Sequence, residues 1–197
     1  MGCRSLLRQP RYACTRCAQT LESAELVCGR CQQQSISFDK TYAACIYEHP
    51  TDRWVQALKF NGQLSYARLM ACCLQSQLQQ FNCDIPLVPV PLHSRRYRQR
   101  GYNQAHEIAR ELSLACGHMV MDQVLERTRD TAMQSELSGK KRHSNVRNAF
   151  RANTTIAAKR VLLVDDVMTT GHTLRACADV LKRAGVEKVD AMVFARA

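Results

Sequence analysis

The segment Val161–Thr173, VLLVDDVMTTGHT, decides the fold that we expect for this chain. Its first four residues are apolar, as in a strand of a parallel sheet whose two faces are both covered. Asp165 and Asp166 follow at the carboxyl end of that strand, and open α/β sheets bind their ligands outside this end of their strands. The sequence therefore predicts a buried central strand that ends in two acidic side chains.

The residues after the two acids predict a phosphate-binding turn. Backbone N–H groups at the start of a helix attract anions, and a glycine lets the ligand approach the backbone closely. A sugar phosphate suits the whole segment, because its hydroxyls match the acids and its phosphate matches the turn. The alternative is a capped strand-to-helix turn with two solvated acids. The turn residues expected at the phosphate are Thr169, Thr170, Gly171 and Thr173, with His172 among them.

Strands and helices alternate along the second half of the chain, which is typical of an α/β fold with a doubly wound parallel sheet. Ile85–Val90 and Lys188–Arg196 are apolar runs of strand length, and 120–125 is a further candidate strand. Gln104–Cys116 is predicted to be a helix, and another is expected from about Thr173 to Ala184.

The region between the cysteine-rich start and this half is also patterned. Residues 38–49 have the aromatic and β-branched residues of a strand, or of a hairpin that closes near His49-Pro50. Asp52 is a candidate N-cap of a helix that stops at Asn61-Gly62. Residues 64–81 repeat apolar side chains at helical spacing, which predicts a second helix.

The chain is strongly basic. Its formal net charge is +11, and 21 of its 28 basic residues are arginine. The planar fork of arginine suits bidentate contact with phosphate, so the composition favours a polyanionic partner or a phosphate-bearing ligand over a merely solvated basic surface. The polar, basic stretch 127–151 is expected to be a long loop, either mobile or with short helical turns. A shorter loop carries four arginines, Arg95, Arg96, Arg98 and Arg100.

Four cysteines near the start have the spacing of a structural zinc site, Cys14-x2-Cys17-x10-Cys28-x2-Cys31. Four thiolates fill a tetrahedral Zn2+ site and leave no open position for catalysis. A module of about 30 residues has too little core to fold without the metal. The alternatives are two disulfides or unpaired thiols. We therefore expect a zinc-ribbon module at 1–37, followed by an α/β domain at 38–197.

Neither a secretory signal nor a stretch of membrane-spanning length is evident in the sequence. The expected location is therefore the cytoplasm. In that reducing compartment, clustered cysteines more often bind metal than form disulfides.

Val161–Thr173 resembles the ligand-binding segment of the type I phosphoribosyltransferases, in which four hydrophobic residues, two acids and a hydrophobic pair precede Thr-Thr-Gly and a further Thr. The resemblance implies that the ligand is phosphoribosyl pyrophosphate (PRPP) with Mg2+. It implies that Asp165 and Asp166, the candidate catalytic residues, hold the ribose 2- and 3-hydroxyls, while the turn grips the 5-phosphate. His172 replaces a small residue of that family; its ring is tolerated if it points outward and otherwise crowds the phosphate.

Further segments resemble the ComF competence protein family and its GntX relatives, in the same order along the chain. They are Ala57–Phe60, Val88–Ala109 with its RGYNQ sequence, and the series Arg142, Asn145, Ala149 and Phe150. The family commonly begins with a cysteine zinc module. The resemblance implies a cytoplasmic protein of natural transformation that handles incoming single-stranded DNA, with a DNA-translocating helicase as a partner.

The resemblance also implies roles for the two basic loops and for the upstream region. Arg96 and Arg100 are the likeliest contacts to pyrophosphate, and residues 39–84 form the hood that recognises the acceptor. The loop 131–150 is expected to be a flexible lid. Its positive charge comes from Lys140, Lys141, Arg142 and Arg147. The aromatic residues of the hood, Trp54, Phe60 and Tyr66, are interpreted as core residues rather than acceptor contacts.

Two functions follow from the sequence. The first is a competence protein that handles single-stranded DNA through a PRPP- and phosphate-binding domain. The alternative is an active phosphoribosyltransferase that transfers ribose 5-phosphate from PRPP to a small base or nucleotide, although neither His93 nor His106 is an evident general base. A PRPP-sensing regulator without turnover ranks below both.

Overall fold

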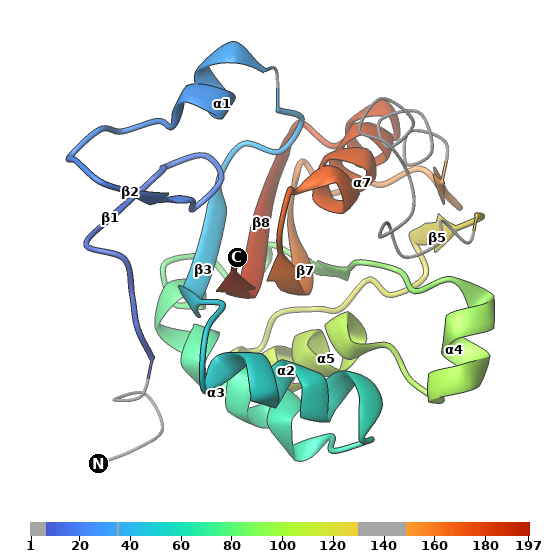
Figure 1. Ribbon diagram of the computed structural model, residues 1–197. Helices are drawn as coiled ribbons and strands as arrows, with labels where there is room; N and C mark the ends of the chain where they lie inside the picture. Colours follow the sequence, from blue (N-terminus) through green and yellow to red (C-terminus); the bar gives the residue numbers. More distant parts are fainter. Residues whose placement is uncertain (1–6, 35, 130–148) are drawn as a thin grey trace.

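The computed structural model describes residues 7–34, 36–129 and 149–197, and its centre is a four-stranded parallel sheet. The strands lie in the order β3-β8-β7-β4 (Figure 1). They are β3 (Thr41–Ile46), β8 (Lys188–Arg196), β7 (Arg160–Met168) and β4 (Leu87–Pro89). The expected α/β fold with a parallel sheet is confirmed.

β7 is a central strand because it is apolar on both faces. Residues 161–164 are fully buried. Their odd-numbered side chains enter one hydrophobic core and their even-numbered side chains enter the other, as the alternation of a strand requires. Leu163 is aligned with Val88 of β4 and with Ala191 of β8, which fixes the register of the sheet.

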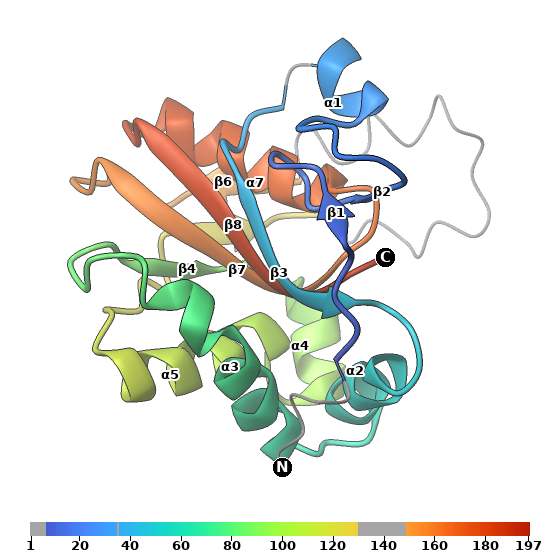
Figure 2. The same ribbon diagram turned by 90° about the vertical axis from the view of Figure 1, so that its left-hand side faces the viewer.

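Helices cover both faces of the sheet (Figures 1 and 2). On one face lie α2 (Thr51–Phe60), α3 (Ser65–Leu78) and α5 (Gln104–Cys116), and α7 (His172–Arg183) packs on the other. An antiparallel pair, β5 (Leu125–Arg127) and β6 (Phe150–Ala152), joins the core on the α7 side. Within the described ranges, no helix combines the length and the apolar character that crossing a bilayer requires.

The cysteine module lies beside the edge strand β3 (Figure 2). It consists of β1 (Tyr12–Ala13), β2 (Thr20–Leu21) and α1 (Gly29–Gln33). Arg196, at the end of β8, is buried between this module and the sheet. Its Nε donates to the carbonyl of Cys17 at 2.9 Å, and its Nη1 donates to the carbonyl of Met168 at 3.1 Å. One guanidinium therefore joins the module to the ends of β7 and β8.

The structure corrects two of the expected secondary-structure elements. The four arginines lie on a short helix, α4 (Ser94–Arg100), and not on a loop. His93 Nδ1 accepts a hydrogen bond from the N–H of Arg95 at the start of this helix, and Gly101 ends it with a φ of +82°. The strand expected at 120–125 is also wrong, because Val120 forms only an isolated bridge to Leu87 and the strand begins at Leu125.

The strand alternative for residues 38–49 is confirmed over Thr41–Ile46, since β3 pairs in parallel with β8 and is not part of a hairpin. The helices expected after Asp52, at 64–81, at 104–116 and at 173–184 are present within a few residues of their expected bounds. The observed bounds of helix α5 and strand β8 are identical to the bounds expected from the sequence.

A buried ion pair under the sheet gives a test of this fold. The Asp190 carboxylate is 1% exposed, and both Nε (2.9 Å) and Nη2 (2.5 Å) of Arg160 donate to its Oδ2. Arg160→Ala removes the only cation paired with this carboxylate among the described residues. Leaving a buried charge unpaired costs about 3 kcal/mol, so we expect urea denaturation to show that loss in the free energy of unfolding.

The neighbouring pair between Lys159 and Glu187 is the control, because its side chains are 82% and 67% exposed. Lys159→Ala should change the free energy of unfolding by less than about 0.5 kcal/mol. Equal losses in the two variants would contradict the assignment of Arg160 as the partner of a buried carboxylate.

Candidate functional site

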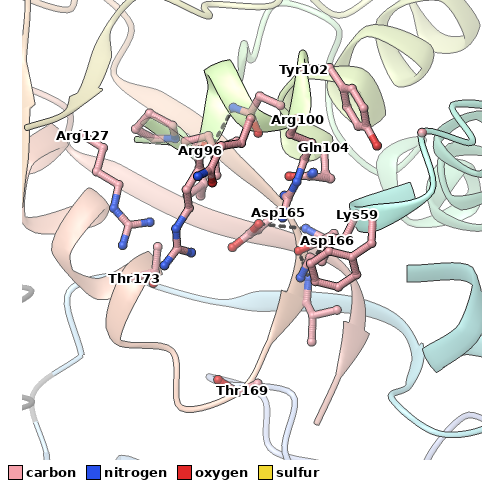
Figure 3. A pocket seen from close by; sticks show the side chains of 18 of the residues that line it. Lys59, Arg96, Arg100, Tyr102, Gln104, Arg127, Asp165, Asp166, Thr169 and Thr173 are labelled. Atoms are coloured by element: carbon pink, nitrogen blue, oxygen red, sulfur yellow. Dashed lines mark hydrogen bonds and ion pairs between the residues drawn. The ribbon is translucent and has the colours of Figure 1, made fainter. Parts of the chain in front are cut away.

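A cavity with a volume of about 730 Å³ lies at the carboxyl ends of β7 and β4 (Figure 3). Asp165 and Asp166 of β7 line it, together with Thr169 and Thr173 of the following turn. The structure thus brings the acids and part of the turn to one hollow, where open α/β sheets bind ligands.

The two acids face different surroundings because successive side chains of a strand point to opposite faces. Asp166 is buried on the α2 side, where its Oδ2 lies 2.9 Å from Nζ of Lys59. The backbone also holds both carboxylates. The N–H of Asp166 donates to Oδ1 of Asp165 at 2.9 Å, and the N–H of Val167 donates to Oδ1 of Asp166 at 2.8 Å.

Lys59 is a site residue to which the sequence analysis assigned no role. In the sequence, Lys59 stands between Leu58 and Phe60 in the last turn of a predicted helix. A lysine at such a position is usually a solvated surface group, so nothing in the sequence distinguishes it. Leu58 is fully buried and fixes the end of α2 against the core, so the adjacent lysine reaches the strand end. Figure 3 shows the side chains of Lys59 and Arg100 extending toward the carboxylates.

The electrostatics of the site raise the pKa of Asp165 toward neutral pH. Burial, reinforced by the charge of Asp166, raises the pKa of Asp165 to about 7, although the Lys59 ammonium opposes this shift. The two carboxylates also act on Lys59. Burial lowers the pKa of Lys59, but attraction to Asp166 and Asp165 outweighs burial, so this pKa lies above its ordinary value. Lys59 therefore stays protonated beside an acid that exchanges its proton close to physiological pH.

The turn between β7 and α7 is shaped by Gly171. This residue has a φ of +76°, and a Cβ on it would lie 2.5 Å from Cε of Met168. Thr170 is exposed, and its Oγ1 lies 3.0 Å from Nδ1 of His172, the first residue of α7. His172 therefore hydrogen-bonds within the turn, and both residues line a small hollow that also contains Thr169.

Basic side chains form the opposite wall of the cavity. Arg96 and Arg100 of α4 line it, whereas Arg95 and Arg98 of the same helix do not. Arg127 of β5 lines it too, and Figure 3 shows Arg96 and Arg127 reaching toward Thr173. The sequence analysis missed Arg127, because nothing in the basic stretch 127–151 distinguishes its first residue.

Gln104, the first residue of α5, supplies an independent sign of a ligand. It lines the cavity and is 4% exposed, yet its Nε2 has no hydrogen-bond partner among the described residues. A buried donor without an acceptor costs about 1–3 kcal/mol, which a ligand oxygen would recover. Asn103 fixes this corner, since its Oδ1 accepts from the N–H of Ala105 and its Nδ2 donates to the carbonyl of Val90.

The aromatic residues of the hood are not all core residues. Trp54 packs between Tyr66 and Phe194, with ring centroids 6.5 Å and 6.2 Å away, as interpreted from the sequence. Phe60 is 68% exposed and lines the cavity, so its interpretation as a core residue is wrong.

The four cysteines of the N-terminal module meet in one buried cluster. The sulfur atoms of Cys14, Cys17, Cys28 and Cys31 all lie within 4.8 Å of one another. The sulfurs of Cys17 and Cys28 are 3.7 Å apart, close to the edge of about 3.8 Å that Zn–S bonds of about 2.3 Å give a tetrahedron. Burial opposes ionisation of the Cys14 thiol, but N–H groups of Cys28, Cys17 and Arg16 lower its pKa to about 7. Burial raises the pKa of the Cys17 and Cys31 thiols, so a bound cation would be needed to hold them as thiolates. The cluster fits a zinc ion held by thiolates.

The remaining predicted residues lie outside the described ranges. They are the lid cations Lys140, Lys141, Arg142 and Arg147. The site as described therefore consists of the acid pair with Lys59, the threonine turn, the arginine wall and Gln104.

Removal of the Lys59 charge tests the electrostatics of the acid pair. Lys59→Gln takes away the ammonium that opposes protonation, so the pKa of Asp165 should rise above about 7. A 13C NMR titration of the Asp165 carboxyl carbon measures this shift directly. Lys182→Gln, which removes a lysine paired with the exposed Asp39, is the control and should leave the midpoint unchanged.

The raised pKa of Asp165 also predicts how the stability of the folded state changes with pH. Because the folded-state pKa of Asp165 lies above its ordinary value of 3.8, its contribution to stability is full below about pH 4. That contribution is lost as the pH rises through about 7, and in Lys59→Gln the loss should extend to higher pH. An Asp165 midpoint that does not move in this variant would refute the pairing.

Comparison with known proteins agrees with this geometry. The family described as "Phosphoribosyl transferase domain" matches residues 98–197. Competence protein F of Haemophilus influenzae is 32% identical over 205 residues, which cover 100% of this chain and 89% of that protein. DNA utilization protein YhgH of Salmonella typhi is 32% identical over 98% of this chain and 88% of its own length. Competence protein ComFC of Streptococcus pneumoniae is 28% identical over 70% of this chain and 60% of its own length.

The first two of these relatives span the cysteine module as well as the sheet, and the phosphoribosyl transferase match contains the strand, the acids and the turn of the cavity. The chain therefore belongs to the ComF family of competence proteins and carries a phosphoribosyl transferase domain.

Proposed function

We propose that this protein binds PRPP, or a related phosphorylated ribose, in the cavity and handles single-stranded DNA during natural transformation. The observation that carries the proposal is the meeting of an acid pair, a threonine turn and an arginine wall in one hollow. The names of its relatives, Competence protein F and DNA utilization protein YhgH, support the DNA-related part. The protein would act in the cytoplasm, with a DNA-translocating helicase as a partner.

Each part of the cavity matches one part of the ligand. Asp165 and Asp166 would accept hydrogen bonds from the ribose 2- and 3-hydroxyls, and Lys59 keeps the Asp166 carboxylate in position. The backbone around Gly171, with the hydroxyls of the turn, would hold the 5-phosphate at the start of α7. Arg96, Arg100 and the amide of Gln104 would contact the pyrophosphate.

Mg2+ fits this site as a companion of PRPP. It prefers oxygen ligands, needs few protein carboxylates and keeps several waters and substrate phosphates in its shell. When bound, it would neutralise part of the pyrophosphate charge. Asp165 and Asp166 are the described carboxylates within reach of such an ion, and the arginine wall supplies the remaining positive charge. The zinc proposed for the cysteine cluster is structural.

Single-stranded DNA would be attracted by the basic helix α4. Arg95 and Arg98 lie on this helix outside the cavity lining, next to Arg96 and Arg100, which line it. A strand that follows α4 would therefore pass the mouth of the cavity. Phosphate contacts release counterions, so binding of this kind weakens steeply with salt.

Neutralising the outer arginines tests the DNA proposal. The double variant Arg95→Gln/Arg98→Gln should bind a thymidine oligonucleotide more weakly, and the slope of log K against log salt should fall by about 1.4, or about 0.7 per lost phosphate contact. Fluorescence anisotropy at several salt concentrations measures both quantities. Arg110→Gln/Arg151→Gln removes the same charge from exposed positions on α5 and β6 and should keep the original slope.

Thermal unfolding with PRPP and Mg2+ tests the phosphoribosyl site. Ligand at about 100 times its dissociation constant stabilises the folded state by about 2.7 kcal/mol, which appears as a rise in Tm. Asp166→Asn and Thr169→Ala should each reduce this rise. Asp52→Asn changes a half-buried carboxylate on α2 outside the cavity lining, and it should keep the rise. An undiminished rise in both cavity variants would place the ligand elsewhere.

An active phosphoribosyltransferase is the second candidate, and the pKa of Asp165 favours it. A carboxyl that exchanges its proton near pH 7 inside a ligand cavity suits acid–base work on an acceptor. In such a reaction the acceptor nucleophile bonds to C1 of the ribose as the bond to pyrophosphate breaks. Acceptor-dependent release of pyrophosphate, absent in Asp166→Asn, would establish this activity; no release across a panel of bases would leave a binding protein.

A further inference from the structure

An exposed aromatic ring stands on the wall of the cavity. Phe60 is 68% exposed, although the residue two places before it, Leu58, is fully buried. Burying a phenylalanine side chain gains about 1.5–3 kcal/mol, and folding leaves most of that gain unused here. An apolar ring kept in contact with water inside a ligand cavity is available to a ligand.

The position of the ring is fixed by the end of α2. Leu58 anchors the helix in the core, and the hydroxyl of Tyr102 donates to its carbonyl. Lys59 ties the same turn to Asp166. The backbone that carries Phe60 is therefore held from both sides, so its ring is presented by a rigid element.

A second planar group lies next to this ring. The guanidinium carbon of Arg100 is 5.4 Å from the centroid of the Phe60 ring, within the range of a cation–π contact. Both side chains line the cavity that also contains the acid pair. The guanidinium lies over one face of the phenyl ring, so a third flat ring can stack on the outer side of this pair.

The surroundings select the kind of ring. Four cationic side chains and two carboxylates line the cavity, so its net charge is positive and disfavours a cationic aromatic ligand. The cations are Lys59, Arg96, Arg100 and Arg127, and the carboxylates are Asp165 and Asp166. An unpaired nucleobase is flat, is neutral and is attached to a sugar phosphate that the arginines attract. Aromatic side chains and arginine planes are the groups on which unpaired bases stack in proteins.

We propose that Phe60 and Arg100 form a stacking site for one unpaired nucleobase, which belongs either to a free nucleotide or to single-stranded DNA. This inference rests on the proposed function only in that the sugar and phosphate of the ligand enter the same cavity. The site makes one prediction that charge alone does not: affinity depends on the presence of a base, and this dependence is lost with the ring of Phe60.

The experiment compares a thymidine oligonucleotide with one of equal length that carries abasic sites. Phe60→Ala should weaken binding of the thymidine oligonucleotide about tenfold, a loss within the range of one stacked base, and should leave the abasic oligonucleotide unchanged. Phe60→Trp should retain base-dependent binding, and Phe60→Leu should lose it. Leu114→Ala removes a side chain that is 72% exposed on α5 outside this cavity, and it should change neither affinity.

A free nucleoside monophosphate, compared with ribose 5-phosphate, separates the two sources of the base. Base-dependent binding of the monophosphate that Phe60→Ala abolishes would assign the site to a nucleotide, and the same effect only with the oligonucleotide would assign it to DNA. For each protein, the affinity for the thymidine oligonucleotide is divided by the affinity for the abasic one. If this ratio is the same in the original protein and in Phe60→Ala, the stacking site is overturned and the proposed function is not. No binding of PRPP or of any oligonucleotide by the original protein would overturn the proposed function, and the stacking site with it.

Discussion

Two adjacent carboxylates at the end of a parallel strand, one buried and one half-buried, are the constraint around which this molecule is arranged. Asp165 and Asp166 follow four fully buried residues of β7, so the sheet fixes the position of their backbone. Their charge is balanced from outside the strand, by Lys59 on α2. The end of α2 is thereby tied to the end of β7, and the cavity lies between them.

The cysteine module belongs to the same frame. Arg196 donates hydrogen bonds to the carbonyl of Cys17, inside the cluster, and to the carbonyl of Met168, the last residue before the threonine turn. Met168 also lies against Gly171, where a Cβ would have no room. A structural zinc ion would therefore stabilise the base of the phosphate turn as well as the module, because the two share one buried guanidinium.

The cavity offers three kinds of chemistry on three sides. The acid pair lies at the strand end, the arginines of α4 face it, and the exposed Phe60 completes the wall on the α2 side. A nucleotide has hydroxyls, phosphates and a flat base, and no single one of these sides would distinguish it from a simpler ligand. Under the proposed function, the combination of the three sides would let a phosphoribosyl transferase domain bind a nucleotide, free or within single-stranded DNA.

The sequence by itself determined the central strand, the acid pair, the glycine turn, the cysteine cluster and most helices, because each depends on residues that are close together in the chain. It did not determine the roles of Lys59, Gln104, Arg127 or Phe60, nor that the arginines form a helix. Lys59 is a site residue only because α2 packs beside β7, more than 100 positions further along the chain. Phe60 is apolar and is therefore expected in the core from the sequence. Its place in the cavity wall is decided by how the end of α2 packs. Local patterns encode local structure, whereas the partner of a side chain is decided by which distant elements the hydrophobic core brings together.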